Sequence, residues 1–195
     1  MFSLVLGLGN IGDKYVGTRH NVGFEVLARV AEELKGRKVR HHDHFVSTQV
    51  ERGDRTVTLG WPTTYMNRSG SAVLEALEFL DLSPAQMLIV VDDFNLPLGA
   101  LRFRAGGSDG GHNGLMSIVA SLETDRFPRL RLGIGSPENA DSVIDYVLGR
   151  FADNELEAAR KMVATAAEAV IFAIDHRLQE AMSKYNMSPA LPEDA

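Results

Sequence analysis

Six polar side chains lie in loops next to apolar stretches of this 195-residue chain, and their types suit hydrolytic chemistry. They are Asn10, His20, Asn67, Asp92, His112 and Asn113. An imidazole beside a carboxylate activates water near neutral pH, because the carboxylate fixes the tautomer and stabilises the imidazolium that forms. Side-chain amides orient a backbone and donate to an oxyanion at any pH. The chain has no Cys and no serine in a nucleophile-elbow motif, so direct attack by water is the simplest chemistry.

Each of these side chains also has a purely structural interpretation. A single histidine beside a helix start, such as His20, is more often a surface or capping residue than a base. Asn67 could cap the helix that follows it, and Asp92 could cap a turn ahead of Pro97. The glycine-rich loop around His112 could be a flexible crossing. The residues taken one by one leave both interpretations open.

Two further patterns point to other kinds of site. Three histidines, His41, His42 and His44, have the donor atoms of a metal site, but their spacing in a strand edge does not converge, so we expect no metal there. A G-x-G-x-x-G run at residues 7–12 follows an apolar strand and matches the dinucleotide-binding fingerprint. Its helix pattern starts only near Asn21, and the acidic residues at the right distance lie inside that helix. This disfavours a nucleotide-dependent oxidoreductase.

The elements that position these residues follow from hydrophobic periodicity. Buried strands are predicted at residues 4–8 and 87–91, further strands at 101–104, which alternates, and 129–134, and a hairpin of two strands at 38–51 and 55–61. Helices are predicted after a cap at Thr18 or Asn21, at 72–80, at 115–122, and at 154–175 with Asp153 or Asn154 as its cap. Residues 176–186 either continue the last helix or break from it. The alternation predicts an α/β fold, a twisted mixed, mostly parallel sheet flanked by helices, with ligands at the carboxyl ends of the strands.

Composition indicates one ordinary globular domain at residues 1–187 and a frayed acidic tail at 188–195. The absence of Cys, of a leader pattern and of a long apolar run predicts a cytoplasmic protein without a membrane anchor. The net charge of −6 argues mildly against non-specific nucleic-acid binding. A local basic patch remains possible in the middle of the chain, and its candidates are Arg102, Arg104, Arg126, Arg129 and Arg131.

Five sequence blocks between residues 6 and 137 together resemble one family. In order they read GLGNIGDKYVGTRHNVGF, PTTYMNRSG, VVDDFNLPLG, GGSDGGHNGL and LRLGIGSP. They closely resemble the bacterial-type peptidyl-tRNA hydrolases. The resemblance implies a monomeric esterase that needs neither metal nor cofactor and cleaves the bond between a peptide and the terminal ribose of tRNA. Its partner is then peptidyl-tRNA, held by the acceptor end and the 5′-phosphate.

The resemblance also implies roles for individual residues. His20 becomes the base that activates water, and Asp92 the carboxylate that orients and polarises it. Three amides hold the peptide and the ester carbonyl, namely Asn10, which we count as catalytic, Asn67 and Asn113. Four side chains line the cleft or neighbour the reacting end, namely Tyr15, Tyr65, Met66 and His112. Two bind the tRNA 5′-phosphate, namely Arg104 and Arg131. The glycines at residues 7–12 would then shape a turn that lets a peptide or RNA end approach.

The chain departs from the family pattern at two places. Family members commonly read His-Asp-Glu-Leu-Asp or a close variant where this chain has Val91-Asp92-Asp93-Phe94-Asn95, which alters the polar support behind the acidic pair. Ser108 and Asp109 interrupt a loop that is often purely glycine with a basic or polar residue. A non-catalytic RNA-binding relative on the same scaffold is the alternative to an enzyme.

Overall fold

The computed structural model describes residues 1–136 and 142–186. The strands are β1 (Leu4–Gly7), β2 (Arg40–His41), β3 (Phe45–Arg52), β4 (Arg55–Pro62), β5 (Met87–Asp93), β6 (Leu101–Arg104) and β7 (Arg129–Gly133). The α-helices are α1 (Val22–Glu33), α2 (Ser69–Leu80), α3 (Asn113–Leu122), α4 (Val143–Leu148), α5 (Leu156–Asp175) and α6 (Leu178–Tyr185). Short 3-10 turns lie at η1 (Asp13–Tyr15), η2 (Arg19–Asn21), η3 (Met66–Arg68) and η4 (Pro84–Gln86). The predicted tail at 188–195 lies outside the described residues.

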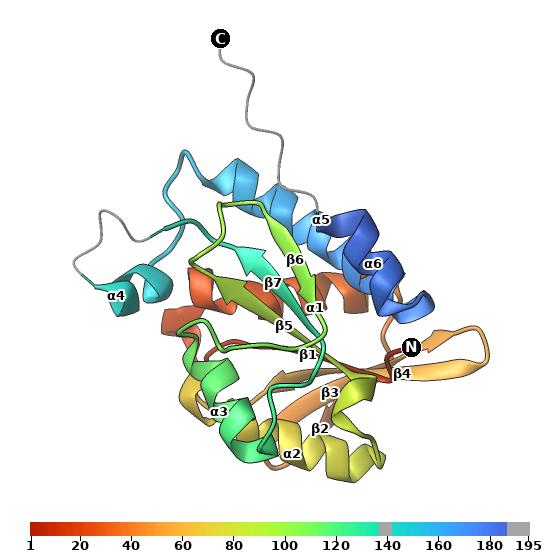
Figure 1. The fold of residues 1–195 in the computed structure, drawn as a ribbon. Helices are drawn as coiled ribbons and strands as arrows, with labels where there is room; N and C mark the ends of the chain where they lie inside the picture. Colours follow the sequence, from red (N-terminus) through yellow and green to blue (C-terminus); the bar gives the residue numbers. More distant parts are fainter. Residues whose placement is uncertain (137–141, 187–195) are drawn as a thin grey trace.

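One seven-stranded sheet forms the centre of the described part of the molecule, in the order β2-β3-β4-β1-β5-β7-β6 (Figure 1). Its four central strands are parallel, whereas β2, β3 and β6 pair antiparallel with their neighbours. The predicted single-domain α/β fold with a mixed, mostly parallel sheet is confirmed. The carboxyl ends of β1, β4 and β5 meet at one edge of the sheet, so the loops that follow them lie together.

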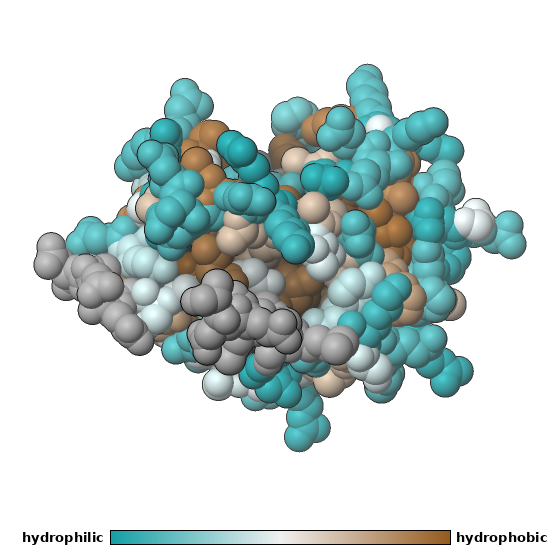
Figure 2. All heavy atoms as spheres, turned by 90° about the horizontal axis from the view of Figure 1, so that it is seen from above, coloured by the Kyte–Doolittle hydropathy of each residue, from teal (hydrophilic) through white to brown (hydrophobic). Residues whose placement is uncertain are grey.

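Helices cover both faces of the sheet (Figure 1). On one face α1, α5 and α6 enclose a core that includes Val5, Val90 and the alanine-rich side of α5. On the other face α2 and α3 enclose a core that includes Leu6 and Ile89. Each buried Val, Leu or Ile contributes about 1.5–3 kcal/mol of hydrophobic free energy. Figure 2 shows the outer surface from above as mostly hydrophilic, with hydrophobic patches between projecting hydrophilic side chains.

Two glycines let α1 pack directly on the sheet. A Cβ added at Gly23 would lie 2.6 Å from the carbonyl oxygens of Leu8 and Val90, and one at Gly7 would lie 2.3 Å from the carbonyl oxygen of Gly23. The expectation that the early glycines all shape a turn is therefore wrong for Gly7, which is a close packing position. Gly12, with φ +105°, does lie in a turn. The close approach holds the start of α1 against the ends of β1 and β5.

Several predicted boundaries differ from the structure. The segment 38–51 is broken after His41, because a tight turn returns the chain and the His42 N–H donates to the Phe45 carbonyl at 2.9 Å. The cap of α5 is Glu155, directly after the predicted alternatives Asp153 and Asn154, and its carboxylate accepts the Ala152 N–H at 2.7 Å. Residues 178–185 form a separate helix, and the six-residue α4 is a helix that periodicity does not predict. Within the described ranges, every helix is too short or too polar to cross a membrane.

Candidate active site

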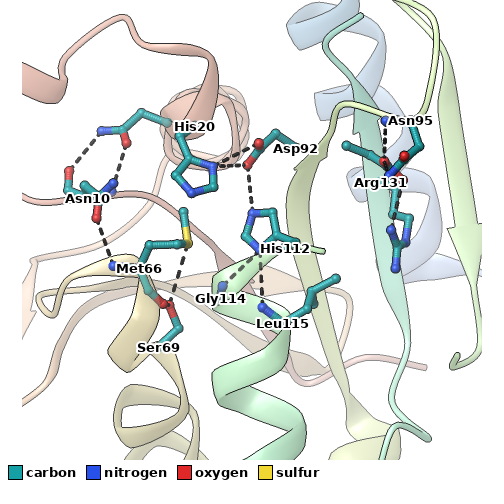
Figure 3. A network of polar contacts seen from close by, with 12 residues as sticks. Asn10, His20, Met66, Ser69, Asp92, Asn95, His112, Gly114, Leu115 and Arg131 are labelled. Atoms are coloured by element: carbon teal, nitrogen blue, oxygen red, sulfur yellow. Dashed lines mark hydrogen bonds and ion pairs between the residues drawn. The ribbon is translucent and has the colours of Figure 1, made fainter. Parts of the chain in front are cut away.

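His20 and Asp92 form a buried pair at the carboxyl edge of the sheet (Figure 3). Asp92 lies one residue before the end of the apolar strand β5 and is 1% exposed, and His20 lies in η2 immediately before α1. The His20 Nδ1 lies 2.9 Å from each Asp92 carboxylate oxygen. Since the carboxylate accepts, Nδ1 carries the hydrogen and Nε2 keeps its lone pair. This arrangement has the geometry of an oriented general base.

His112 contacts the same carboxylate, next to His20 (Figure 3). Its Nε2 lies 3.0 Å from Asp92 Oδ1. Its Nδ1 accepts the backbone N–H groups of Gly114 and Leu115, at 3.1 and 3.2 Å, and so caps α3. A nitrogen that accepts two hydrogen bonds carries no hydrogen, so the hydrogen of neutral His112 is on Nε2 and is donated to Asp92.

Opposing effects act on the Asp92 carboxyl. Burial alone would raise its pKa, but the neighbouring His112 and His20 outweigh burial through charge and hydrogen bonds, and the pKa of Asp92 falls well below its usual range. Asp92 is therefore an anion over the whole working pH range.

The donor atoms of this cluster are close enough for a metal ion, but the hydrogen bonds of His112 oppose metal binding. The ligand atoms of His20, Asp92 and His112 all lie within 4.8 Å of one another. Binding through His112 Nε2 would move its hydrogen to Nδ1, which already faces two N–H donors. The histidines of residues 41–44 face separate partners: His42 pairs with Ser47 at 3.0 Å, and His44 pairs with Glu75 at 3.0 Å.

Asn10 is fixed in one orientation beside this pair (Figure 3). Its side-chain Oδ1 accepts the Met66 N–H at 2.8 Å, so its amide NH₂ is the group left to donate into the cleft. Its backbone is held on both sides by Asn21: the Asn10 N–H donates to Asn21 Oδ1 at 2.8 Å, and the Asn21 amide donates to the Asn10 carbonyl at 2.9 Å. Sequence reasoning considered Asn21 only as a helix cap and missed this clamp.

Two cavities open on either side of His20. The larger, about 430 Å³, is lined by Asn10, Lys14, Tyr15, His20, Tyr65, Met66, Asn67, Asn113, Ile144, Val147 and Leu148. The smaller, about 330 Å³, is lined by His20, Asp92, Phe94, Gly111, His112, Asn113, Val143, Ile144 and Val147. Nine of the predicted site residues therefore meet around one cleft. The α4 residues in both walls were missed, because six residues are too few for a periodic pattern.

The remaining two predicted residues lie on a separate cavity of about 300 Å³. Arg104 and Arg131 line it together with Arg102 and Asp93. Arg131 is 11% exposed, and its guanidinium donates to Asp93 at 2.9 Å and to the Ser108 carbonyl at 2.5 Å. Arg104, in contrast, is exposed at the end of the edge strand β6.

Not all the arginines of the predicted basic patch belong to it. Arg129 is fully buried, and its guanidinium donates to backbone carbonyls, including those of Gly107 at 2.7 Å and Asp125 at 2.6 Å. Burial, with the nearby charge of Arg131, lowers its pKa to about 10, so it stays charged at neutral pH. Arg126 lines a different cavity. The expectation of a place in the basic patch is therefore wrong for Arg129, which instead holds the backbone at Gly107 and Asp125 in place.

Comparison with known proteins gives one answer at three levels. Residues 4–193 match the family model described as peptidyl-tRNA hydrolase. Peptidyl-tRNA hydrolases of Sulfurihydrogenibium sp. and Clostridium botulinum are 42% identical over 186 residues and 41% over 183, covering 95% and 94% of this chain and 98% and 96% of theirs. The crystal structure of peptidyl-tRNA hydrolase from Acinetobacter baumannii superposes with a TM-score of 0.89 at 34% identity, covering 96% of this chain and 95% of that one. The chain therefore belongs to the peptidyl-tRNA hydrolase family of enzymes.

Proposed function

We propose that this chain hydrolyses the ester bond between peptide and tRNA in peptidyl-tRNA, with His20 as the base that activates water. The observation that carries the proposal is the pair formed by His20 Nδ1 with both oxygens of buried Asp92 at 2.9 Å. It leaves Nε2 of His20 free to take a proton, and Asp92 stabilises the imidazolium that results.

In the proposed reaction a water oxygen attacks the ester carbonyl carbon while one of its protons moves to His20 Nε2. The carbonyl oxygen becomes an oxyanion, which the amide NH₂ of Asn10 and the amides of Asn67 and Asn113 stabilise by donating hydrogen bonds. The bond to the ribose oxygen then breaks, and that oxygen takes the proton from His20. The products are tRNA with a free terminal hydroxyl and a peptide carboxylic acid, which loses its proton to solvent and becomes a carboxylate.

The larger cavity suits the peptide, because its lining includes both side-chain amides and apolar side chains. Tyr15, Tyr65 and Met66 line it together with residues of α4. His112 acts through Asp92, as a positioning residue. In the separate arginine-lined cavity, Arg104 and Arg131 bind the 5′-phosphate of the tRNA.

We also propose that the protein acts as a monomer in the cytoplasm and needs no metal. The tautomer of His112 supports metal independence, because the cluster at Asp92 is a poor cation site as long as His112 caps α3. The alternative of a non-catalytic RNA-binding relative is disfavoured by membership of an enzyme family, and so is the oxidoreductase alternative.

Replacement of His20 tests the base assignment. His20→Ala should lower kcat on an N-blocked aminoacyl-tRNA by about 100-fold or more, the usual cost of removing a general base. The matched control is His44→Ala, which removes a histidine that pairs with Glu75 at 3.0 Å on an exposed surface. A His20→Ala variant within a few fold of the wild-type kcat would show that His20 is not the base.

A further inference from the structure

The helix α4 forms a wall of both cavities beside His20, yet little in its own sequence holds it there. It has six residues, and among them Val147 is the buried one. Figure 1 shows it at the edge of the sheet toward which β5 and β7 point. Isolated helices of this length do not persist in water. The position of the wall must therefore come from contacts outside α4.

Arg19, the residue before His20, supplies such contacts. Its guanidinium lies between two aromatic rings, 4.4 Å from the centroid of Tyr146 in α4 and 4.8 Å from that of Phe151. It also donates to the Arg150 carbonyl and pairs with Glu155 at 2.5 Å. Arg19 is 7% exposed, so the planar cation is enclosed by the segment that follows α4. A cation between two rings in a desolvated place is held strongly.

The backbone joins the same two segments. The Arg19 N–H donates to the Gly149 carbonyl at 2.9 Å, and Thr18 forms a β-bridge with Arg150. The η2 turn that carries His20 and the chain after α4 thus form one unit. The Arg19 side chain ties the turn that carries His20 to α4 and the segment after it, because its guanidinium contacts the Tyr146 and Phe151 rings, the Arg150 carbonyl and the Glu155 carboxylate.

We propose that Arg19 is a positioning residue that sets the α4 wall against His20 and so determines how well the enzyme accepts an apolar side chain next to the ester. This proposal rests on the proposed function, which assigns the larger cavity to the peptide. Ile144 and Val147 then contact the side chain of the peptide's last residue, and a glycine there makes no such contact.

The test compares two substrates, N-acetyl-leucyl-tRNA and N-acetyl-glycyl-tRNA, with Arg19→Lys. Lysine keeps the charge but lacks the planar group that stacks between rings and donates to two acceptors. We expect kcat/KM for the leucyl substrate to fall about 10-fold, mainly through KM, the scale of one apolar contact in a pocket. The glycyl substrate should stay within about threefold, and the pH profile should keep its shape. Amide hydrogens of residues 143–148 should exchange faster than in the wild type, while those of β5 should not.

Arg52→Lys is the matched control, since Arg52 pairs with Asp175 at the other end of α5. It should leave the ratio of the two substrates unchanged. Equal losses on both substrates with Arg19→Lys, or an unchanged ratio despite faster exchange in α4, would overturn the proposal. Either result would leave the assignment of His20 intact, because that assignment depends on His20→Ala alone. Where Arg19→Lys folds poorly, Glu155→Gln weakens the same clamp from its other side, and the same shift in substrate ratio is expected.

Discussion

The imidazole of His112 accepts two backbone N–H groups on Nδ1, so the start of α3 decides which of its nitrogens carries the hydrogen. That hydrogen goes to Asp92 Oδ1, the same atom that faces His20 Nδ1 at 2.9 Å. Asp92 thus has two donors and no need of a proton of its own. The start of α3 thus orients His112, His112 holds Asp92, and Asp92 holds His20. A base that is fixed in this way loses little free energy to reorganisation during the reaction.

The lowered pKa of Asp92 predicts how stability depends on acid. An unfolded aspartate titrates at about pH 3.9, and folding favours the ionised form of Asp92, so its contribution is complete above that pH and is lost as the pH falls toward the folded pKa. The urea midpoint of the wild type should therefore decrease more steeply between about pH 5 and pH 3 than that of Asp92→Asn. Other carboxyls titrate equally in both proteins, so the difference in slope isolates Asp92. Parallel curves would contradict the prediction.

Residue chemistry was the part of the site most accessible from sequence. His20 and Asp92 could be paired because polar residues after parallel strands meet at one edge of a sheet, and motif resemblance fixed which ones. Asn21 could not be predicted as a clamp, because its partner is the backbone of Asn10, and a backbone partner leaves no mark in side-chain types. Arg129 and Arg131 are alike in the sequence, and only the fold separates them, by burying Arg129 against backbone carbonyls and pairing Arg131 with Asp93.

At the scale of elements, the site depends on how closely α1 approaches β1 and β5. The long strands and helices were predictable because each repeats its period several times. The helix α4 was not, since it depends on residues far away in the sequence such as Arg19. The break after His41 was also missed, because the β-forming residues on its two sides read as one continuous strand.

Gly23 offers a direct test of that close approach. A Cβ at this position would lie 2.6 Å from two backbone oxygens, which cannot move aside as a flexible side chain can. Gly23→Ala should lower the free energy of unfolding by about 1–3 kcal/mol. It should also shift the start of α1 and with it His20. This should lower kcat by up to about 100-fold, because a catalytic group misplaced by about 1 Å can cost that much in rate. Urea unfolding and steady-state kinetics measure the two effects.

Gly36→Ala is the control for this test, since Gly36 follows the same helix at its far end and meets the side chain of Thr48 at 3.0 Å. It should affect stability without changing kcat of the folded enzyme. If Gly23→Ala kept full kcat while losing stability, the approach of α1 would support the fold alone and not the position of His20.

At the scale of the whole molecule, the order of the strands separates the cleft beside His20 from the arginine-lined cavity. Sequence could predict a mixed sheet but not that β6 pairs antiparallel at the edge, which sets Arg102 opposite Arg131 and away from the cleft. Strand order depends on long-range packing, which local sequence patterns do not predict. The result is a protein of net charge −6 in which three arginines, Arg102, Arg104 and Arg131, line one cavity away from the cleft.

This distribution of charge predicts that the affinity for tRNA depends only weakly on salt concentration. Each phosphate contact contributes a slope of about −0.7 to −0.9 to the plot of log affinity against log salt. With Arg102, Arg104 and Arg131 on the cavity and Asp93 pairing one of them, we expect a slope near −2 in 1/KM for N-acetyl-aminoacyl-tRNA and little change in kcat. Arg104→Ala should reduce the slope by about 1 and act mainly on tRNA that carries its 5′-phosphate.

The control is Arg29→Ala, since Arg29 pairs with Glu33 on the exposed side of α1. A slope of −6 or steeper would mean that RNA follows a much longer basic surface than this cavity provides.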